Sequence, residues 1–305
     1  MPEGSTSAII FDRGLVRRRR RRAVAMGPAT FLLDRVADDI VERLGAVLRR
    51  FDLALDLGTP GDAVRAALAR LPSIGTIVSA GAAGGVVAAR PQQHNHVVAD
   101  EEALPFADGA LDLVVSALAL QFVNDLPGVL IQIRRALKPD GLFLAALIGG
   151  ESLAELRVSF AAAESEVEGG VSPRVAPFVD LRDLGALLQR AGFALPVTDV
   201  DRLTVRYDSA FDLMHDLRRM GATNALLARR RTPLRRATLL RMAEIYGQRF
   251  ADADGRVRAT FEIVWLSGWA PHPDQQKPLR PGSAKTRLAD ALGTREISAG
   301  DKARR

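Results

Sequence analysis

The stretch FDLALDLGTPGDAVRAAL, residues 51–68, decides the fold that this sequence predicts. An aliphatic run ends at Gly58, a short glycine-rich turn follows, and a helical pattern begins after the turn. A strand, a glycine turn and a helix in this order are typical of a loop that cradles a nucleotide at the carboxyl end of a parallel strand. Pro60 departs from that pattern, because proline lacks a backbone N–H and fixes φ at about −65°.

Further aliphatic runs on either side of helical patterns extend this unit into a sheet. We expect strands at 53–58, 75–80, 94–100, 110–118, 141–147, 197–207 and 258–269. The helical pattern at 125–137 is expected to end at the sequence KPDG, where the chain turns. Strands that alternate with helices predict a Rossmann-like α/β fold: a mostly parallel seven-stranded sheet with helices on both faces. Residues 208–250 read as a helical insertion between the last two strands.

Length and composition bound the domain organisation. We divide the 305 residues into a basic N-terminal arm at 1–27, the α/β domain at 28–270, and a C-terminal extension at 271–305 that is polar at its end and expected to be partly disordered. No apolar run approaches the ~18 residues of a membrane span, and the start lacks the long apolar region of a secretory signal. We therefore expect a cytoplasmic protein. The absence of cysteine excludes disulfides, thiolate nucleophiles and cysteine zinc sites.

The net charge of +6 comes almost entirely from arginine, and one run is exceptionally dense. Residues 17–22 are six consecutive arginines, whose local positive field attracts anionic partners. Nucleic acid is disfavoured as the partner, because no aromatic side chains are interleaved for base stacking. The prediction is a solvated helix start, or an arm that docks on a protein or at the surface of the inner membrane.

Candidate ligand-binding residues lie where the early strands end, because open α/β sheets bind ligands outside the carboxyl ends of their strands. Those residues are Asp56, Gly58 and Gly61 after the first strand, Asp100 and Glu101 after the third, and Ser116 to Gln121 after the fourth.

Several blocks carry a resemblance that spans nearly the whole chain. They are IIFDRGLVRRRRRRA, LALDLG, ADEEALPFADGALDLVVSALALQFVNDLP, LKPDG, GGESLAELR, EGGVSPRVAPF, DLGALLQRAGF and RPGSA. With them the chain resembles class I S-adenosylmethionine-dependent methyltransferases. It is most similar to the branch that includes an assembly factor of respiratory complex I, NADH:ubiquinone oxidoreductase, which hydroxylates an arginine of a complex I subunit. GGESLAELR and GGVSPRVAPF are more specific to that branch than the general methyltransferase motifs.

The resemblance implies roles for the candidate residues. Asp56 and the turn at Gly58 would face the methionine part of S-adenosylmethionine. Asp100 would bind the adenine amino group, and Glu101 would offer a backbone contact. The alternative for Asp56 is a carboxylate that only stabilises the turn.

Two departures from the family pattern concern the cofactor. Pro60 stands where members usually have the second glycine of D-L-G-x-G-x-G, and Gly61 lies one place away. After the second strand, where an acidic residue normally accepts both ribose hydroxyls, the sequence offers only Ser79. Losing a charge-assisted bidentate contact lowers affinity by about tenfold or more. Weak or altered binding of S-adenosylmethionine is therefore expected.

The sequence gives no obvious catalytic base and no metal site. His94 and His96 are expected at the start of the third strand, away from the ligand edge, and the histidines lack the spacing of metal ligands. Glu151 and Glu155 are expected to project from the first turn of a helix, where a pair of carboxylates could hold a substrate arginine by its fork of donors. The alternative for these two acids is stabilisation of the helix dipole.

Three functions remain open from the sequence. The first is a protein-modifying enzyme of complex I assembly that hydroxylates an arginine, as the resemblance implies. The second is a conventional methyltransferase that acts on a small molecule or a carrier-bound acid. The third is a non-catalytic assembly chaperone that keeps the fold and the basic arm.

Overall fold

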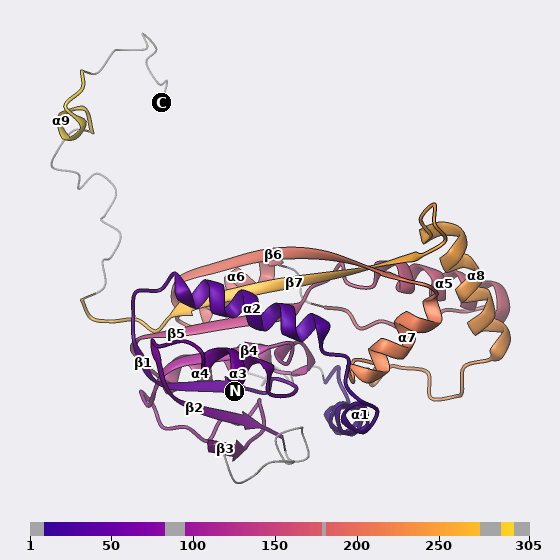
Figure 1. Cartoon of the computed structure of the whole chain (residues 1–305), viewed down its shortest axis with the longest axis horizontal. Coiled ribbons are helices and arrows are strands. Elements are labelled where there is room, and N and C mark those ends of the chain that lie inside the picture. The colour runs from indigo at the N-terminus through magenta and orange to yellow at the C-terminus, as the bar shows by residue number, and fades with distance from the viewer. Residues whose placement is uncertain (1–8, 83–94, 179–180, 275–287, 296–305) are drawn as a thin grey trace, which may run out of the picture. The chain divides into compact units, whose positions relative to one another are not determined.

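The structure is a computed structural model that describes residues 9–82, 95–178, 181–274 and 288–295. Within these residues, seven strands form one sheet (Figure 1). The strands are β1 (Phe51–Leu57), β2 (Ile74–Gly81), β3 (Asn95–Val98), β4 (Leu111–Ala117), β5 (Leu137–Ile148), β6 (Ala194–Tyr207) and β7 (Val257–Trp269).

The strand order is β3-β2-β1-β4-β5-β7-β6. Strands β1 to β5 pair in parallel, whereas β7 runs antiparallel to both β5 and β6. The order of the strands reverses at β1, which lies between β2 and β4, and this switch point is where such sheets bind ligands. The predicted mostly parallel, seven-stranded Rossmann-like sheet is confirmed.

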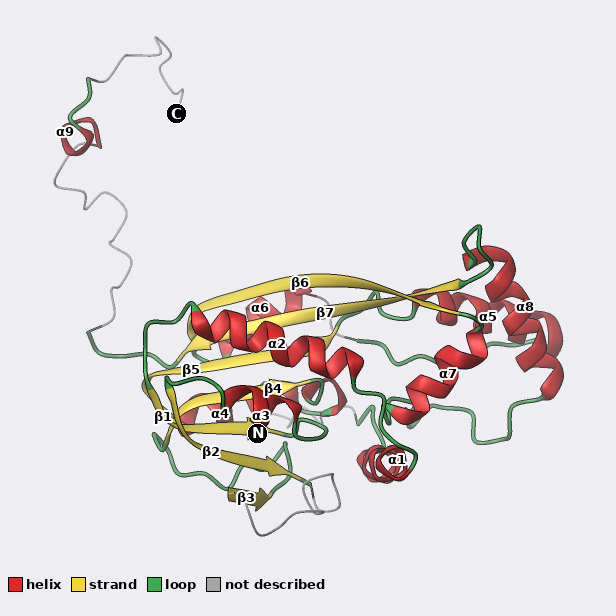
Figure 2. Cartoon of the chain, viewed as in Figure 1, coloured by secondary structure: helices red, strands yellow, loops and turns green. Residues whose placement is uncertain are grey.

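The helices cover both faces of this sheet (Figure 2). In the unit that contains the sheet, the helices are α1 (Arg13–Ala25), α2 (Phe31–Gly45), α3 (Ala63–Leu68), α4 (Leu126–Ala136), α5 (Ala154–Glu168), α6 (Leu181–Arg190), α7 (Ala210–Arg219) and α8 (Arg236–Phe250). A separate small unit begins at His272 and contains α9 (Leu288–Leu292). A short 3-10 helix, η2 (Leu120–Phe122), follows β4. Helices α7 and α8 lie between β6 and β7, which confirms the predicted insertion.

The hydrophobic core has two parts, one on each face of the sheet, because successive side chains of a strand point to opposite faces. On β1, Ala54 faces the cluster that includes α2, α3, α5, α7 and α8, while the next residue, Leu55, faces the cluster with α4 and α6. Both residues are fully buried. The continuous aliphatic runs of the sequence arise because both faces of these strands are covered by helices.

One element boundary differs from the expectation. The sequence KPDG does not separate α4 from a strand that begins at Gly141; it lies inside β5, which starts at Leu137. The register between β4 and β5 shifts there, and Asp140 has a φ of 58°. The proline and glycine therefore form a bulge in the strand, where the lost ladder bonds are tolerated.

The basic N-terminal segment also differs from the predicted separate arm. The arginine run lies within α1, which belongs to the same compact unit as the sheet. Asp12 caps this helix by accepting a hydrogen bond from the Leu15 N–H at 2.9 Å. Phe11 makes a bridge to Leu226 of the insertion, so the start of the segment is fastened to the rest of the unit. The RPGSA block and most of the C-terminal extension lie outside the described residues.

Candidate cofactor and substrate site

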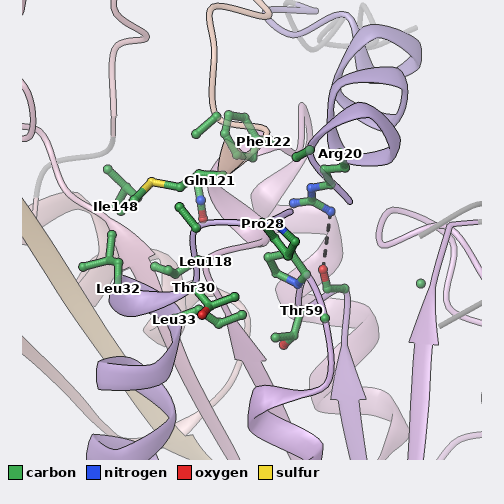
Figure 3. A pocket seen from close by; sticks show the side chains of 18 of the residues that line it. Arg20, Pro28, Thr30, Leu32, Leu33, Thr59, Leu118, Gln121, Phe122 and Ile148 are labelled. Carbon is green, nitrogen blue, oxygen red and sulfur yellow. Dashed lines mark hydrogen bonds between the residues drawn. The ribbon is translucent and has the colours of Figure 1, made fainter. Parts of the chain in front are cut away.

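A cavity of about 300 Å³ opens at the carboxyl ends of the central strands, at the switch point of the sheet (Figure 3). Its walls come from the loop after β1, the end of β2, η2, helices α1 and α2, and the segment after α7. Apolar side chains such as Leu32, Leu33 and Phe122 form much of its surface, and a few polar groups point into it. An apolar pocket with few polar groups is the usual form of a small-molecule site.

The cavity brings together most of the residues that the sequence singled out. Asp56, Gly58, Gly61, Glu101 and Gln121 all line it. They come from three different strand ends, as the rule for parallel sheets requires.

Two predicted residues lie elsewhere. Ser116 is buried in β4 and donates its hydroxyl to the Leu57 carbonyl oxygen at 2.8 Å, which ties β4 to β1. Asp100 does not line the cavity, because its carboxylate is bound by arginines of α1. A role in binding adenine would require Asp100 to release these partners, and Ser116 is a structural residue.

Three buried polar atoms of the lining have no hydrogen-bond partner among the described residues. They are Oδ1 of Asp56, Oε1 of Gln121 and Nδ1 of His96. Buried polar groups are nearly always paired, so unpaired groups around one cavity point to a polar ligand that pairs with them.

The position of His96 differs from the expectation that it lies away from the ligand edge. The sequence predicts it at the end of the third strand that lies away from the ligand site, but β3 is only four residues long and pairs His96 with Ser79 at the end of β2. Both residues line the cavity. The predicted strand runs to residue 100, whereas β3 ends at Val98, so His96 lies closer to the ligand edge than expected. His94 lies outside the described residues.

Asp56 has the most perturbed acidity of the lining. Burial raises the pKa of its carboxyl from 3.8 to about 7, although a hydrogen bond with Thr59 acts in the opposite direction. Only 3% of the residue is exposed. Burial therefore destabilises the negative form of Asp56, and a cationic group of a ligand would favour it.

Helix α1 carries arginines onto the acidic sequence at the end of β3. Arg13 contacts Asp100 at 2.5 Å and Glu102 at 2.8 Å, and it also pairs with Glu101. Arg17 forms a second ion pair with Asp100. Arg13 and Arg17 therefore neutralise a cluster of carboxylates, which is a role that the sequence did not suggest.

Arg20 lies at the junction between this cluster and the cavity. Its Nη1 donates to the Gly58 carbonyl oxygen at 3.4 Å, and the guanidinium lies 5.8 Å from the ring centre of Phe122 (Figure 3). Burial lowers the pKa of Arg20, and the Glu101 carboxylate at 3.6 Å partly offsets this effect. The cavity thus offers a guanidinium for an anionic group on the same side as the Gly58 turn.

The turn after β1 allows a test of how tightly the site is packed. Gly58 has a φ of 70°, and a Cβ atom there would lie 2.8 Å from Cγ of Glu101. We expect Gly58→Ala to displace Glu101, to break its ion pairs with α1 and to destabilise the protein by about 2–3 kcal/mol. Gly61 also has a positive φ, of 92°, but a Cβ added there would meet no atom within 4 Å.

Gly61→Ala is therefore the matched control for this substitution. It adds backbone strain of about 1 kcal/mol without a collision. Urea unfolding of both variants measures the difference. Equal loss of stability in the two variants would show that Glu101 moves freely and that the turn is not packed as described.

Backbone strain is also concentrated around the cavity. Leu118 after β4 has a φ of 51°, and Leu153 before α5 has a φ of 57°. Both line the cavity. Non-glycine residues in the left-handed region cost energy and tend to persist at functional sites.

The predicted pair of acidic residues for a substrate arginine does not form. Helix α5 begins at Ala154, so Glu151 precedes it in a turn and is exposed, and it does not line the cavity. The Glu155 carboxylate instead accepts from the hydroxyl of Thr260 at 2.5 Å and from its N–H at 3.2 Å. The two acids therefore do not lie together in the first turn of a helix as expected, because Glu151 precedes α5 while Glu155 fastens α5 to β7.

Substitution of Glu155 and of Glu151 tests whether the first has a structural role and the second lies only at the surface. We expect Glu155→Gln to lower the free energy of unfolding by about 1–3 kcal/mol, since the donors of Thr260 lose a charged acceptor. Glu151→Gln should leave stability within about 0.5 kcal/mol of the native value. Thermal unfolding of both variants checks this; a stable Glu155→Gln protein would contradict the anchoring role.

The loop after α5, which contains the block GGVSPRVAPF, forms part of the wall above the cavity. Glu164 is fully buried, and its carboxylate accepts from the Ser172 N–H at 2.7 Å and from the Arg174 Nε at 2.7 Å. Farther along, Ala176 packs in a small cluster with Phe11 from the N-terminal segment. The block is therefore a structural clasp that fastens this loop to α5 on one side and to the N-terminal segment on the other.

The residues of the main cavity fit an amino-acid-containing cofactor of the methyltransferase kind. The cavity offers the guanidinium of Arg20 together with the unpaired acceptors of Asp56 and Gln121, which suits a zwitterion. It also offers Ser79, the register partner of Asp56 on β2, and His96 on β3. In the described part of the chain, no three histidine, aspartate or glutamate side chains are grouped as around a metal ion. None of the described helices has the length and apolar character of a membrane span.

Comparisons with known proteins agree with this geometry. A model of the methyltransferase domain family matches residues 55–145. The crystal structure of a protein from Bacillus halodurans, described as a methyltransferase, superposes with a TM-score of 0.53 at 19% identity and covers 77% of this chain and 98% of that one. This likeness shows the fold.

Curated relatives extend the similarity over the whole chain. The malonyl-[acyl-carrier protein] O-methyltransferase of a Methylovorus species is 33% identical over 90% of this chain and 97% of its own length. The mitochondrial arginine hydroxylase NDUFAF5 of Mus musculus is 38% identical over 99% of this chain and 90% of its own. The Homo sapiens protein of the same name is 41% identical over 93% of this chain and 84% of its own. The chain therefore belongs to the family of the arginine hydroxylase NDUFAF5, a family with the methyltransferase fold.

Proposed function

We propose that this chain is a protein-modifying enzyme of complex I assembly, and that it hydroxylates an arginine side chain of a complex I subunit. The observation that carries the proposal is the similarity to the arginine hydroxylases over 93–99% of the chain. An alignment of that extent includes the clasp at Glu164 and the arginines of α1, which lie outside the region matched by the general methyltransferase model.

Intact-mass analysis of the complex I subunits tests this function. Subunits purified from cells that lack this chain should include one that is lighter by one oxygen atom than its counterpart from normal cells. A difference of one methyl group would instead support a methyltransferase. If no subunit differs, the chain is not a modifying enzyme, and the non-catalytic chaperone becomes the better account.

The cavity would hold S-adenosylmethionine through groups that the structure leaves unpaired. Arg20 would bind the carboxylate of the methionine part, and Asp56 and Gln121 would accept hydrogen bonds from its ammonium group. Ser79 and His96 would face the ribose. When bound, the cofactor would supply a sulfonium with an electrophilic methyl group, which serves methyl transfer; hydroxylation takes its oxygen atom from a separate oxidant. The residues of this chain bind and orient it and exclude water from it.

We also propose that this binding is weak. Pro60 gives the turn one N–H fewer than a glycine there would, and at the ribose end the neutral Ser79 replaces a carboxylate. Calorimetric titration with S-adenosylmethionine should give a dissociation constant above about 10 μM, consistent with losing at least one charge-assisted contact. A dissociation constant of about 1 μM or lower would contradict the proposal.

A second candidate function is O-methylation of a carboxylate. It is favoured by the similarity to the Methylovorus relative, because 97% of the length of that protein aligns with this chain. A carboxylate is already deprotonated at neutral pH, so this reaction needs no general base. The intact-mass experiment separates this function from hydroxylation, since a carboxylate of a small or carrier-bound acid is methylated without any change in the complex I subunits.

The outward face of α1 is the part of the arginine run that remains available for a partner. Arg18 and Arg21 are exposed and make no ion pair with the described residues. We propose that they contact the protein substrate or the anionic surface of the inner membrane. Flotation with vesicles that contain anionic lipid should show binding that an Arg18→Gln, Arg21→Gln double variant loses. Unchanged flotation of the double variant would contradict the membrane contact.

A further inference from the structure

A second cavity lies beside the main one, behind helix α1. Its volume is about 350 Å³. The two cavities share part of their lining, at Phe122, Leu153, Phe178, Leu217 and Ala222. None of the roles assigned above uses the second cavity.

The arginine run contributes to both cavities because of its helical spacing. Arg17 and Arg20, three residues apart, line the main cavity, whereas Arg19 and Arg22, also three apart, line the second. Residues three or four apart lie on the same face of a helix. Helix α7 adds Arg218 to the second cavity.

The two sides of α1 differ in how their charges are balanced. Arg13, Arg17 and Arg20 all face carboxylates. The lining of the second cavity contains no aspartate or glutamate, and Arg19 and Arg22 form no ion pair within the described residues. The second cavity therefore has a positive side without a protein counter-charge.

Arg19 shows this imbalance most directly. Its Nη1 is buried and has no hydrogen-bond partner among the described residues. Burial lowers the pKa of Arg19, the nearby charge of Arg229 lowers it further, and the charge of Asp12 offsets these effects only in part. By contrast, Arg174, the remaining cation of the lining, is neutralised by the buried Glu164. A guanidinium nitrogen that is buried without a partner is costly, and an anion placed in the cavity would relieve that cost.

Apart from Thr223 and Asn224, the rest of the lining is apolar. It includes Leu156 and Phe160 of α5, Met214 of α7, and Leu234 before α8. These side chains also belong to, or pack against, the hydrophobic core. The cavity therefore combines cations on one side with an apolar floor.

We propose that the second cavity binds an amphiphilic monoanion, with its carboxylate against Arg19, Arg22 and Arg218 and its aliphatic tail on the apolar floor. The planar guanidinium matches a carboxylate through paired hydrogen bonds. An acidic side chain of a peptide has only one or two methylene groups and would leave the floor empty. A substrate arginine is excluded by its positive charge, so this ligand is distinct both from the protein substrate and from the S-adenosylmethionine proposed for the main cavity.

Calorimetric titration of the full chain with decanoate tests the proposal. Decanoate is expected to bind at least tenfold more tightly than decanol, which lacks the charge, and than acetate, which lacks the tail. The double variant Arg22→Gln, Arg218→Gln should weaken decanoate binding by about tenfold or more, because two charge-assisted contacts are lost. Both residues are exposed, so the fold should tolerate the change.

Two further variants keep the result interpretable. Arg21→Gln removes an exposed arginine of the same helix that lines neither cavity, and decanoate affinity should not change. Met214→Trp fills the floor of the second cavity and should weaken decanoate without affecting acetate. A glutamate-rich peptide that displaces decanoate would show that the site takes an acidic peptide instead.

Other results would also overturn the proposal. They are equal affinities for decanoate and decanol, or an unchanged affinity in the double variant whose thermal unfolding is normal. Because the titration needs neither S-adenosylmethionine nor a complex I subunit, its outcome is independent of the proposed enzymatic function.

Discussion

An Asp56→Asn variant is expected to bind S-adenosylmethionine about a hundredfold more weakly than the native chain at about pH 8. The carboxylate of Asp56 is buried, lines the main cavity, and has one oxygen without a partner among the described residues. Asparagine keeps the shape of the side chain but removes the negative charge that would face the ammonium group. The loss of a charged hydrogen bond in a buried site costs about 2–3 kcal/mol, which corresponds to that factor.

The native chain should also show a pH dependence that the variant lacks. Burial raises the pKa of Asp56 to about 7 in the protein alone, so the carboxyl is protonated below that pH. A cationic ligand binds the deprotonated form better, so affinity should rise with pH through about 7 and binding should release a proton. Calorimetry in buffers of different ionisation enthalpy measures the proton release directly.

The control for this experiment is Asp62→Asn. Asp62 lies in the same turn and also lines the cavity, but its side chain is exposed, so its charge is screened by water. We expect a change in affinity of about threefold or less for this control. A native chain whose affinity is flat between about pH 6 and 8, with no proton released, would exclude Asp56 as the partner of the ammonium group.

The same pKa makes a prediction for the protein without ligand. Because the native state holds the Asp56 proton up to about pH 7 and the unfolded state only to about 3.8, stability falls as pH rises through this window. The linked free energy is on the order of 4 kcal/mol. Asp56→Asn should therefore be more stable than the native chain at about pH 8, although it binds the cofactor less well.

The fold could be predicted from the sequence because its signals are local. The strands are short aliphatic runs, and the helices between them have regular apolar spacing, so each element is recognisable without knowledge of its neighbours. The KPDG error shows the limit of this reasoning. A proline and a glycine indicate a break in regular structure, but whether that break is a turn or a bulge depends on how β4 pairs with β5.

The site was only partly predictable, because many of its contacts join residues far apart in the chain. Asp56 and Gln121 follow from the rule for strand ends, and both line the cavity. Arg13 contacts Glu101, which is 88 positions away, and Glu155 contacts Thr260, which is 105 positions away. No local pattern tells a solvated arginine from one that faces a distant acid. The helical spacing of the arginine run was the one available signal that its members have different environments.

The largest loss of stability is expected for Glu164→Gln. The Glu164 side chain is completely buried and holds Arg174, whose side chain is only 16% exposed, together with Ser172. Burial raises the pKa of Glu164, but hydrogen bonds from Ser172 and Arg174 more than offset this and hold the pKa below its usual value. Glutamine leaves the Arg174 charge buried without a counter-charge, which typically costs about 3–5 kcal/mol.

The loss of stability should be local as well as global, because Glu164 fastens the loop that lines both cavities. Phe178 lines the two cavities, and Val175 lines the second. When the clasp is broken, this loop should become accessible to proteases at temperatures where the sheet is still folded. Limited proteolysis with mass mapping of the cleavage sites tests this, alongside urea unfolding.

A neighbouring ion pair on the same helix supplies the control. Glu166 pairs with Arg241 at 2.6 Å, but 49% of its side chain is exposed. Water and salt screen this pair, so Glu166→Gln should cost less than about 1 kcal/mol and should not open the loop. Similar losses in the two variants would mean that Glu164 contributes no more than a surface acid. A larger loss for Glu164→Gln, with cleavage confined to the loop, would show that one buried carboxylate holds the loop that lines both cavities.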